Sequence, residues 1–262
     1  MTVRIAWERR GAGPPLVLVH GLGYARWGWG WEPVADALAE RFELILLDNR
    51  GIGASEAPPG PYAVGPMAAD VAYVMDDAGI GRAHVLGTSL GGMIAQELAL
   101  ACPDRVDRLV LACTTPGGPS AYPLLEDTLR LMAEAPSLEP LVALRLFVEN
   151  ALAPQTVADR PELVERILAH RLAAPQDPAA WAAQAAAGMS FDRFADVDAI
   201  AAPTLLQHGT EDRVVDARNM TLLRERIPGA KVDLFEGGGH LFFWEQPERF
   251  VASVCTFLED HS

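Results

Sequence analysis

The stretch that decides the fold is Gly87-Thr88-Ser89-Leu90-Gly91-Gly92, which lies between two segments of different character. The residues before it, Ala83-His84-Val85-Leu86, form a short apolar run typical of a buried strand, whereas residues 93–100 have the pattern of a helix. These six residues therefore have to reverse the chain between a strand and a helix. Glycines at 87 and 91 suit such a tight reversal, because they remove side chains that would clash in it.

The serine in this turn is placed for chemistry. The pattern G-x-S-x-G between a strand and a helix is typical of a nucleophile elbow, which lifts the serine hydroxyl above the sheet. The alternative is an ordinary strand-to-helix turn with a bystander serine. A serine hydroxyl is a weak nucleophile and needs a base, which an acid in turn orients. If Ser89 is the nucleophile, these partners have to be present elsewhere in the chain.

Apolar runs on both sides of the turn predict the rest of the sheet. We expect strands at 3–8, 16–20, 43–47, 83–86, 108–113, 203–208 and 230–236. Helical patterns fall between them, at 31–41, 66–78, 93–100 and 247–258. Strands that are apolar throughout and alternate with helices indicate an α/β fold. They predict a mostly parallel, doubly wound sheet of about seven or eight strands.

Residues 120–199 have a different character. They contain no convincing strand, are rich in Ala, Leu and Glu, and are punctuated by prolines, which predicts four or so short helices. We therefore expect a core domain of residues 1–119 and 200–262, interrupted by a helical cap over residues 120–199. Ligands bind beyond the carboxyl ends of parallel strands, where this insertion also emerges, and this favours a cap over a purely stabilising decoration.

Composition excludes several classes of partner. The formal net charge of the 262 residues is −14, which disfavours binding to nucleic acid or to an anionic membrane surface. Three scattered cysteines predict neither a disulfide framework nor a metal site. The N-terminus lacks the apolar region of a signal peptide, and no run is long enough to span a bilayer. We expect a cytoplasmic protein, monomeric or homodimeric, that acts on a small molecule.

The base and the acid are predicted from loops that follow late strands. His240 comes after a predicted strand and three glycines, on a loop that can carry an imidazole to the elbow, with His208 as the reserve. Asp212 follows the strand at 203–208 and is the expected acid, with Glu211 as the alternative. The resulting order of serine, aspartate and histidine is the one that accompanies a G-x-S-x-G elbow.

Acyl transfer also needs donors for the negative charge that develops on the carbonyl oxygen. The backbone N–H of Leu90, directly after the serine, is the first expected donor. The loop His20-Gly21-Leu22-Gly23 follows an early strand, so the N–H of Leu22 is the expected second donor.

Taken together, these motifs resemble those of α/β-hydrolase-fold enzymes over nearly the full chain. The matching segments are 20–23, 48–55, 87–92, 209–212 and 239–240. The wording is most similar to that of carboxylesterases and enol-lactone hydrolases. Haloalkane dehalogenases and epoxide hydrolases of this fold carry an aspartate in place of Ser89, and the serine argues against both.

The resemblance implies a serine hydrolase that cleaves carboxylic esters or lactones through an acyl-enzyme, with no metal and no cofactor. Two alternatives use the same triad: hydrolysis of a C–C bond in a diketone, and cofactor-free formation of a peracid. A third alternative, from another class, is a ligand sensor built on a hydrolase scaffold.

Aromatic residues near these motifs are candidates for lining the substrate pocket. For the aromatic residues that follow the 20–23 loop there is an alternative: they pack the first helix against the cap. Arg26 is the one charged residue in that loop. It either binds a carboxylate of the substrate or is solvated by water. The candidates for substrate contact are Tyr24, Arg26, Trp27, Phe242 and Trp244, with Trp29, Trp31 and Phe243 beside them.

Overall fold

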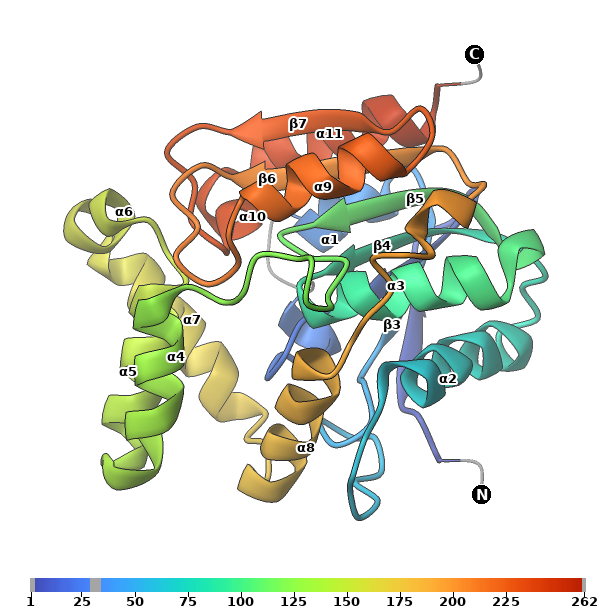
Figure 1. Cartoon of the computed structure of the whole chain (residues 1–262). Helices are drawn as coiled ribbons and strands as arrows, with labels where there is room; N and C mark the ends of the chain where they lie inside the picture. The colour runs from blue at the N-terminus through green and yellow to red at the C-terminus, as the bar shows by residue number, and fades with distance from the viewer. Residues whose placement is uncertain (1–2, 29–33, 261–262) are drawn as a thin grey trace.

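A central sheet dominates the structure, a computed structural model that describes residues 3–28 and 34–260 (Figure 1). Within these residues seven strands pair in the order β1-β3-β2-β4-β5-β6-β7. Every pair is parallel except β1 with β3. The strands are β1 (Trp7–Arg10), β2 (Pro15–Val19), β3 (Glu43–Leu47), β4 (Ala83–Thr88), β5 (Val106–Ala112), β6 (Thr204–Gly209) and β7 (Lys231–Phe235). The predicted α/β class and mostly parallel sheet are confirmed.

The first strand lies later than predicted. The apolar residues of 3–8 predicted a strand there, but β1 begins at Trp7, which pairs with Leu47 in the antiparallel register. Residues before it bind a loop instead of a strand: Ala6 O accepts a hydrogen bond from Asp48 N at 2.9 Å, and Ala6 N donates to Ser55 Oγ at 2.8 Å. The apolar pattern located Ile5, which is buried, and Val3 and Trp7, which pack against the core. The partners of the backbone groups, however, depend on distant sequence.

Helices cover both faces of the sheet, as the sequence predicted. One face carries α2 (Val64–Asp77), α3 (Leu90–Ala101) and α9 (Arg218–Arg226), and the other carries α1 (Val34–Ala39), α10 (Phe242–Glu245) and α11 (Pro247–Leu258). Strand β2 shows why its sequence is apolar throughout. Val17 and Val19 pack into the core under the first set of helices, and Leu16 and Leu18 pack into the core under the second.

A run of helices joins β5 to β6. The structure describes α4 (Glu126–Glu134), α5 (Pro140–Asn150), α6 (Pro154–Asp159), α7 (Pro161–Ala173) and α8 (Pro178–Met189) in this segment. Four of the prolines that the sequence placed between helices stand at the first position of α5 to α8, where the missing N–H costs nothing. In Figure 1, α4, α5, α6 and α7 lie beyond the end of the sheet toward which the arrowheads of β5 and β7 point.

Short 3-10 turns also occur among the described residues. They are η1 (Arg26–Gly28), η2 (Pro103–Arg105), η3 (Ala135–Ser137) and η4 (Val197–Ala199).

Among the described residues, none of the helices combines the length and the apolar character that crossing a bilayer requires.

Glycine at position 91 is required by a close backbone approach. A Cβ atom there would lie 2.6 Å from the carbonyl carbon of Val19 and 2.8 Å from the carbonyl oxygen of His20, neither of which can move without disturbing β2. We expect Gly91→Ala to lower the free energy of unfolding by about 3 kcal/mol or more, measured by urea denaturation.

The matched control is Gly81→Ala, since a Cβ at that position would meet no atom within 4 Å. Its φ is not positive, so alanine should be neutral or stabilise by about 0.4–1 kcal/mol. Equal stability of the two variants would contradict the steric argument.

Candidate active site

Ser89 occupies a strained turn, and its hydroxyl makes no hydrogen bond with the described residues. It lies between β4 and α3 with φ 53° and ψ −119°, a conformation that few residues other than glycine adopt. Although Ser89 is the N-cap of α3, its side chain makes no capping hydrogen bond. Hydrogen bonds from neighbouring segments hold its backbone: Ser89 N donates to Ala112 O at 2.9 Å, and Thr114 Oγ1 donates to Ser89 O at 2.8 Å. The turn therefore presents the hydroxyl instead of using it structurally.

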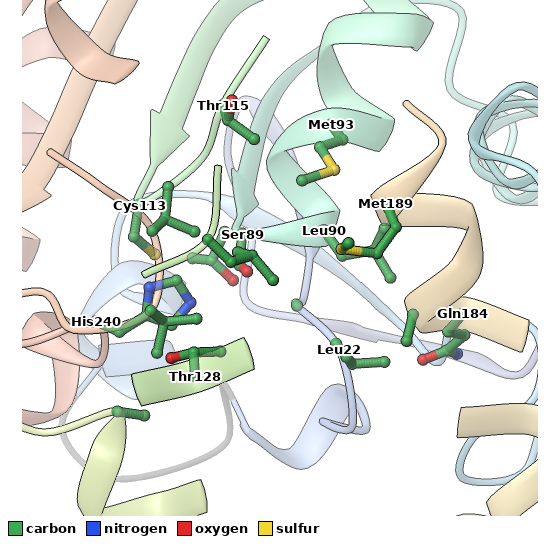
Figure 2. A pocket seen from close by; sticks show the side chains of 18 of the residues that line it. Leu22, Ser89, Leu90, Met93, Cys113, Thr115, Thr128, Gln184, Met189 and His240 are labelled. Carbon is green, nitrogen blue, oxygen red and sulfur yellow. The ribbon is translucent and has the colours of Figure 1, made fainter. Parts of the chain in front are cut away.

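The hydroxyl faces a cavity of about 540 Å³, a size that suits a small molecule. Figure 2 shows Ser89 between His240 and Cys113 on one side and Leu90 and Met189 on the other. Most of the lining is apolar. It comes from the loop after β2, the turn before α3, the chain after β5, the helices α4, α5, α7 and α8, and the segments after β6 and β7.

His240 and Asp212 form a buried hydrogen-bonded pair at this cavity. His240 Nδ1 lies 2.8 Å from Asp212 Oδ2, which leaves Nε2 of the imidazole for another partner. The loops after β6 and β7 bring the two residues together, since these strands are neighbours in the sheet. Asp212 Oδ1 also accepts hydrogen bonds from Val214 N at 2.8 Å and Val215 N at 3.0 Å. Glu211, the alternative acid, is exposed.

The carboxylate of Asp212 is held in its ionised form. Burial by itself would raise its pKa, but attraction to His240 and hydrogen bonds from His208 and His240 outweigh burial, so the pKa is lowered overall. Asp212 is therefore a fixed negative charge whose hydrogen bond orients His240.

His208 is a second histidine on the same carboxylate oxygen. Its Nε2 lies 2.9 Å from Asp212 Oδ2 and 3.1 Å from Val215 O. Both neighbours are acceptors, so Nε2 carries the hydrogen and His208 donates. His208 is buried and is not among the described residues that line the cavity, whereas His240 is. Of the two candidate bases, only His240 thus faces the space beside Ser89.

The loop after β2 lies directly against the turn at Ser89. A Cβ on Gly21 would come within 3.1 Å of Ser89 Cβ, and His20 O in the same loop is fixed by Asn49 Nδ2 at 2.9 Å. Leu22 and Leu90 both line the cavity (Figure 2). Leu90 is the first residue of α3, so its N–H has no acceptor within the helix. The two predicted donor residues therefore lie at the same cavity as the serine.

The candidate substrate residues occupy different places. Tyr24 lines the cavity, but Arg26, Trp27, Phe242 and Trp244 are not among the described lining residues. Arg26 pairs with Asp48, and its guanidinium carbon lies 5.1 Å from the centre of the Trp27 ring.

The other two aromatics pack behind the cavity. The Phe242 ring packs in the core, 4.4 Å from that of Phe235, and Trp244 meets the ring of His170 edge-on at 5.8 Å. Phe243 lines the cavity. Trp29 and Trp31 lie outside the described residues.

Several lining residues were missed from the sequence, and many of them come from the helices between β5 and β6. They include Thr128, Asn150, Arg171, Gln184 and Met189. Asn150 Nδ2 donates to Thr128 Oγ1 at 2.7 Å. No motif spacing marks these positions, because helices pack on a cavity through contacts that are distant in sequence.

Cys113 is a further sulfur group at the cavity, next to Ser89 in Figure 2. Burial, reinforced by the negative charge of Asp212, raises the pKa of its thiol well above the ordinary value. The thiol therefore stays protonated and is a poor competitor for Ser89 as a nucleophile.

Comparison with known proteins places these features in a family. The model of the α/β hydrolase fold family matches residues 14–247. A protein named as a carbamate hydrolase, RutD, from Azorhizobium caulinodans is 32% identical over 261 residues, which cover 96% of this chain and 93% of that protein. A pimeloyl-acyl-carrier-protein methyl ester esterase from Aeromonas salmonicida is 30% identical over 272 residues, covering 97% of this chain and 99% of the esterase.

A solved structure gives the same picture. The crystal structure of the enol-lactonase from Burkholderia xenovorans LB400 superposes with a TM-score of 0.86 at 25% sequence identity, covering 98% of this chain and 97% of the lactonase.

The half-buried His170 should make the protein acid-sensitive. Burial, and then the charge of Arg171, lower the pKa of His170 from 6.5 to about 4. Between these pH values the unfolded chain binds a proton that the folded protein does not, so stability is full above pH 6.5 and falls as the pH approaches 4. We expect His170→Gln to lose less stability than the wild type between pH 7 and pH 5 in urea denaturation. Equal losses in the two proteins would contradict this assignment.

Proposed function

This chain belongs to the α/β hydrolase fold family, and we propose that within it the protein is a serine hydrolase of carboxylic esters or lactones. One observation carries the proposal. A disengaged serine hydroxyl in a strained turn shares a cavity with an imidazole whose Nδ1 is already bound to a buried, ionised aspartate. That arrangement activates an oxygen nucleophile and has no evident structural purpose.

The proposed reaction proceeds in two halves. Ser89 Oγ attacks the carbonyl carbon of the substrate while His240 Nε2 takes the hydroxyl proton, and Asp212 stabilises the imidazolium. The tetrahedral intermediate collapses, the C–O bond to the leaving group breaks, and His240 returns the proton to the departing alcohol oxygen. Water then attacks the acyl-enzyme by the same steps, which releases the carboxylic acid and restores Ser89.

The negative charge of each tetrahedral intermediate needs fixed donors. We assign this role to the N–H groups of Leu22 and Leu90, since both residues line the cavity. Gly21 brings the loop that carries Leu22 against Ser89, and Leu90 directly follows the serine. Ser89 and His240 form no hydrogen bond with each other among the described residues, and such bonds often tighten only when substrate is bound.

The helices between β5 and β6 are proposed to act as a cap. In this division, residues 1–119 and 200–262 form the catalytic core, and residues 120–199 form the lid. Lining residues from α4, α5, α7 and α8 support this role, because they close the side of the cavity that faces away from the sheet.

Ser89→Ala should abolish hydrolysis. Removal of the nucleophile is expected to lower kcat by about 10³- to 10⁶-fold, because the remaining groups bind substrate but form no acyl-enzyme. The measurement is the initial rate on p-nitrophenyl esters from acetate to decanoate and on simple lactones. A fluorophosphonate should label wild-type Ser89 covalently, with the site of attachment identified by mass spectrometry.

The matched control is Ser137→Ala, which removes the hydroxyl of an exposed serine that is not among the described residues lining the cavity. It should retain wild-type rates. Near-wild-type turnover by Ser89→Ala would exclude the proposed nucleophile. Labelling of Ser89 with no turnover on any ester or lactone would point to the C–C hydrolase, perhydrolase or carbamate reactions, and a protein that is neither labelled nor active would favour a ligand sensor.

His208 is expected to position Asp212. His208→Leu removes one donor to Oδ2 of Asp212, so the carboxylate should orient His240 less well and kcat should fall about tenfold with little change in KM. His208→Gln keeps an N–H donor and should recover most of the rate. If both variants lose the same activity, or if KM changes instead of kcat, His208 serves packing alone.

A further inference from the structure

Arg171 brings an arginine side chain from α7 to the cavity. Its guanidinium carbon lies 4.6 Å from the centre of the Tyr24 ring. It also packs against the loop after β2, where a Cβ on Gly23 would lie 2.5 Å from Arg171 Nη2. Gly23 has a φ of 78°, so the loop has both the conformation and the free space that this contact requires. The loop and the guanidinium thus fit together.

The charge of Arg171 is distinctive for this cavity. Among the described lining residues it is the only lysine, arginine, aspartate or glutamate, in a chain whose formal net charge is −14. Arg26 and Arg50 form ion pairs with Asp48 and Asp70, whereas within residues 3–28 and 34–260 no carboxylate forms an ion pair with Arg171. The cavity therefore carries one positive charge without a negative partner from the described protein.

The geometry leaves this charge available to a ligand. The Arg171 guanidinium lies over the Tyr24 ring and also hydrogen-bonds to the Tyr24 side chain. A guanidinium has five N–H donors in a planar fork, so that one bond leaves others for a carboxylate, which can bind two of them. Neighbouring histidines do not compete as cations. Burial first, with the charge of Arg171 as a further cause, lowers the pKa values of His20 and His170 below their ordinary range.

The distance from Ser89 is short. Gly21 abuts Ser89, Gly23 abuts the guanidinium, and two residues of chain span at most about 7 Å. Leu22, the proposed oxyanion donor, stands between them. A molecule whose carbonyl lies at Ser89 can therefore reach Arg171 through a spacer of a few carbon atoms.

We propose that Arg171 binds a carboxylate of the substrate, so that the substrate class is an ester or lactone that carries a second, free carboxylate a few carbon atoms from the scissile carbonyl. This inference rests on the proposed hydrolase function. It adds a specificity-determining residue and a substrate class to that function: half-esters of short dicarboxylic acids, or lactones with a carboxylate side arm.

A matched pair of substrates tests this proposal. Mono-p-nitrophenyl glutarate and p-nitrophenyl pentanoate share the leaving group and the chain length, and differ in the terminal carboxylate. For Arg171→Gln we expect kcat/KM on the glutarate ester to fall about 10- to 100-fold, mainly through KM. On the pentanoate ester it should stay close to the wild-type value. Arg171→Lys keeps the charge and should recover part of the loss.

The control is Arg166→Gln, which removes an equal charge from the exposed side of the same helix, outside the described cavity lining. It should leave the preference between the two esters unchanged. A parallel loss on both esters in Arg171→Gln, or an unchanged preference, would overturn the proposal. Thermal unfolding of each variant identifies a folding defect. If Arg171→Gln is unstable, the test uses Arg171→Lys and the ratio of kcat/KM for the two esters.

A binding measurement separates this proposal from the hydrolase function. Titration calorimetry with glutarate should detect binding to the wild type, Ser89→Ala and Arg166→Gln, and weakened binding to Arg171→Gln. Such a result without turnover of either ester would support the carboxylate site while the proposed reaction fails. Equal glutarate affinity in Arg171→Gln, or no binding to the wild type, would overturn the site whatever the esters show.

Discussion

The close backbone contact between the end of β2 and the turn at Ser89 is the constraint on which the rest of the site depends. Val19 pairs with Gly87 in the sheet, and the glycines at 21 and 91 let the two segments touch without side chains between them. Ser89 has a positive φ in this turn, and Gly21, the neighbour of Leu22 in sequence, abuts its side chain. The strain is offset by the burial of two central strands, so folding itself prepares the geometry for reaction.

A second constraint is electrostatic. Asp212 is buried, and an ionised carboxylate in that position would be costly without partners. Two histidines and two backbone amides supply four hydrogen-bond donors, from the end of β6 and from the loops after β6 and β7. The same bonds that stabilise the charge also fix the imidazole of His240. The orientation of the proposed base is therefore tied to the pairing of these neighbouring strands.

The sequence predicted those parts of the molecule that local pattern controls. The strand-to-helix turn, the buried strands and the residues that end them follow from apolar periodicity and glycine spacing. In the structure Ser89 and His240 line one cavity, and Asp212 is bound to His240. Arg26 and Arg171 show a feature that local sequence pattern does not control. Arg26 sits beside a recognisable motif, but its charge is paired with Asp48 and Glu8. Arg171 lies in a helix without a recognisable motif, yet it lines the cavity. Packing between segments that are distant in sequence decides which charges are neutralised.

The acidity of the whole chain does not oppose an anionic substrate. At physiological ionic strength the Debye length is about 8 Å, so exposed carboxylates act weakly on an ion that approaches from solvent. Inside a cavity lined mostly by apolar groups the local dielectric is lower, and the nearby guanidinium of Arg171 dominates the field. Net charge therefore bears on partners with extended charged surfaces, whereas one unpaired cation decides which small molecule the cavity accepts.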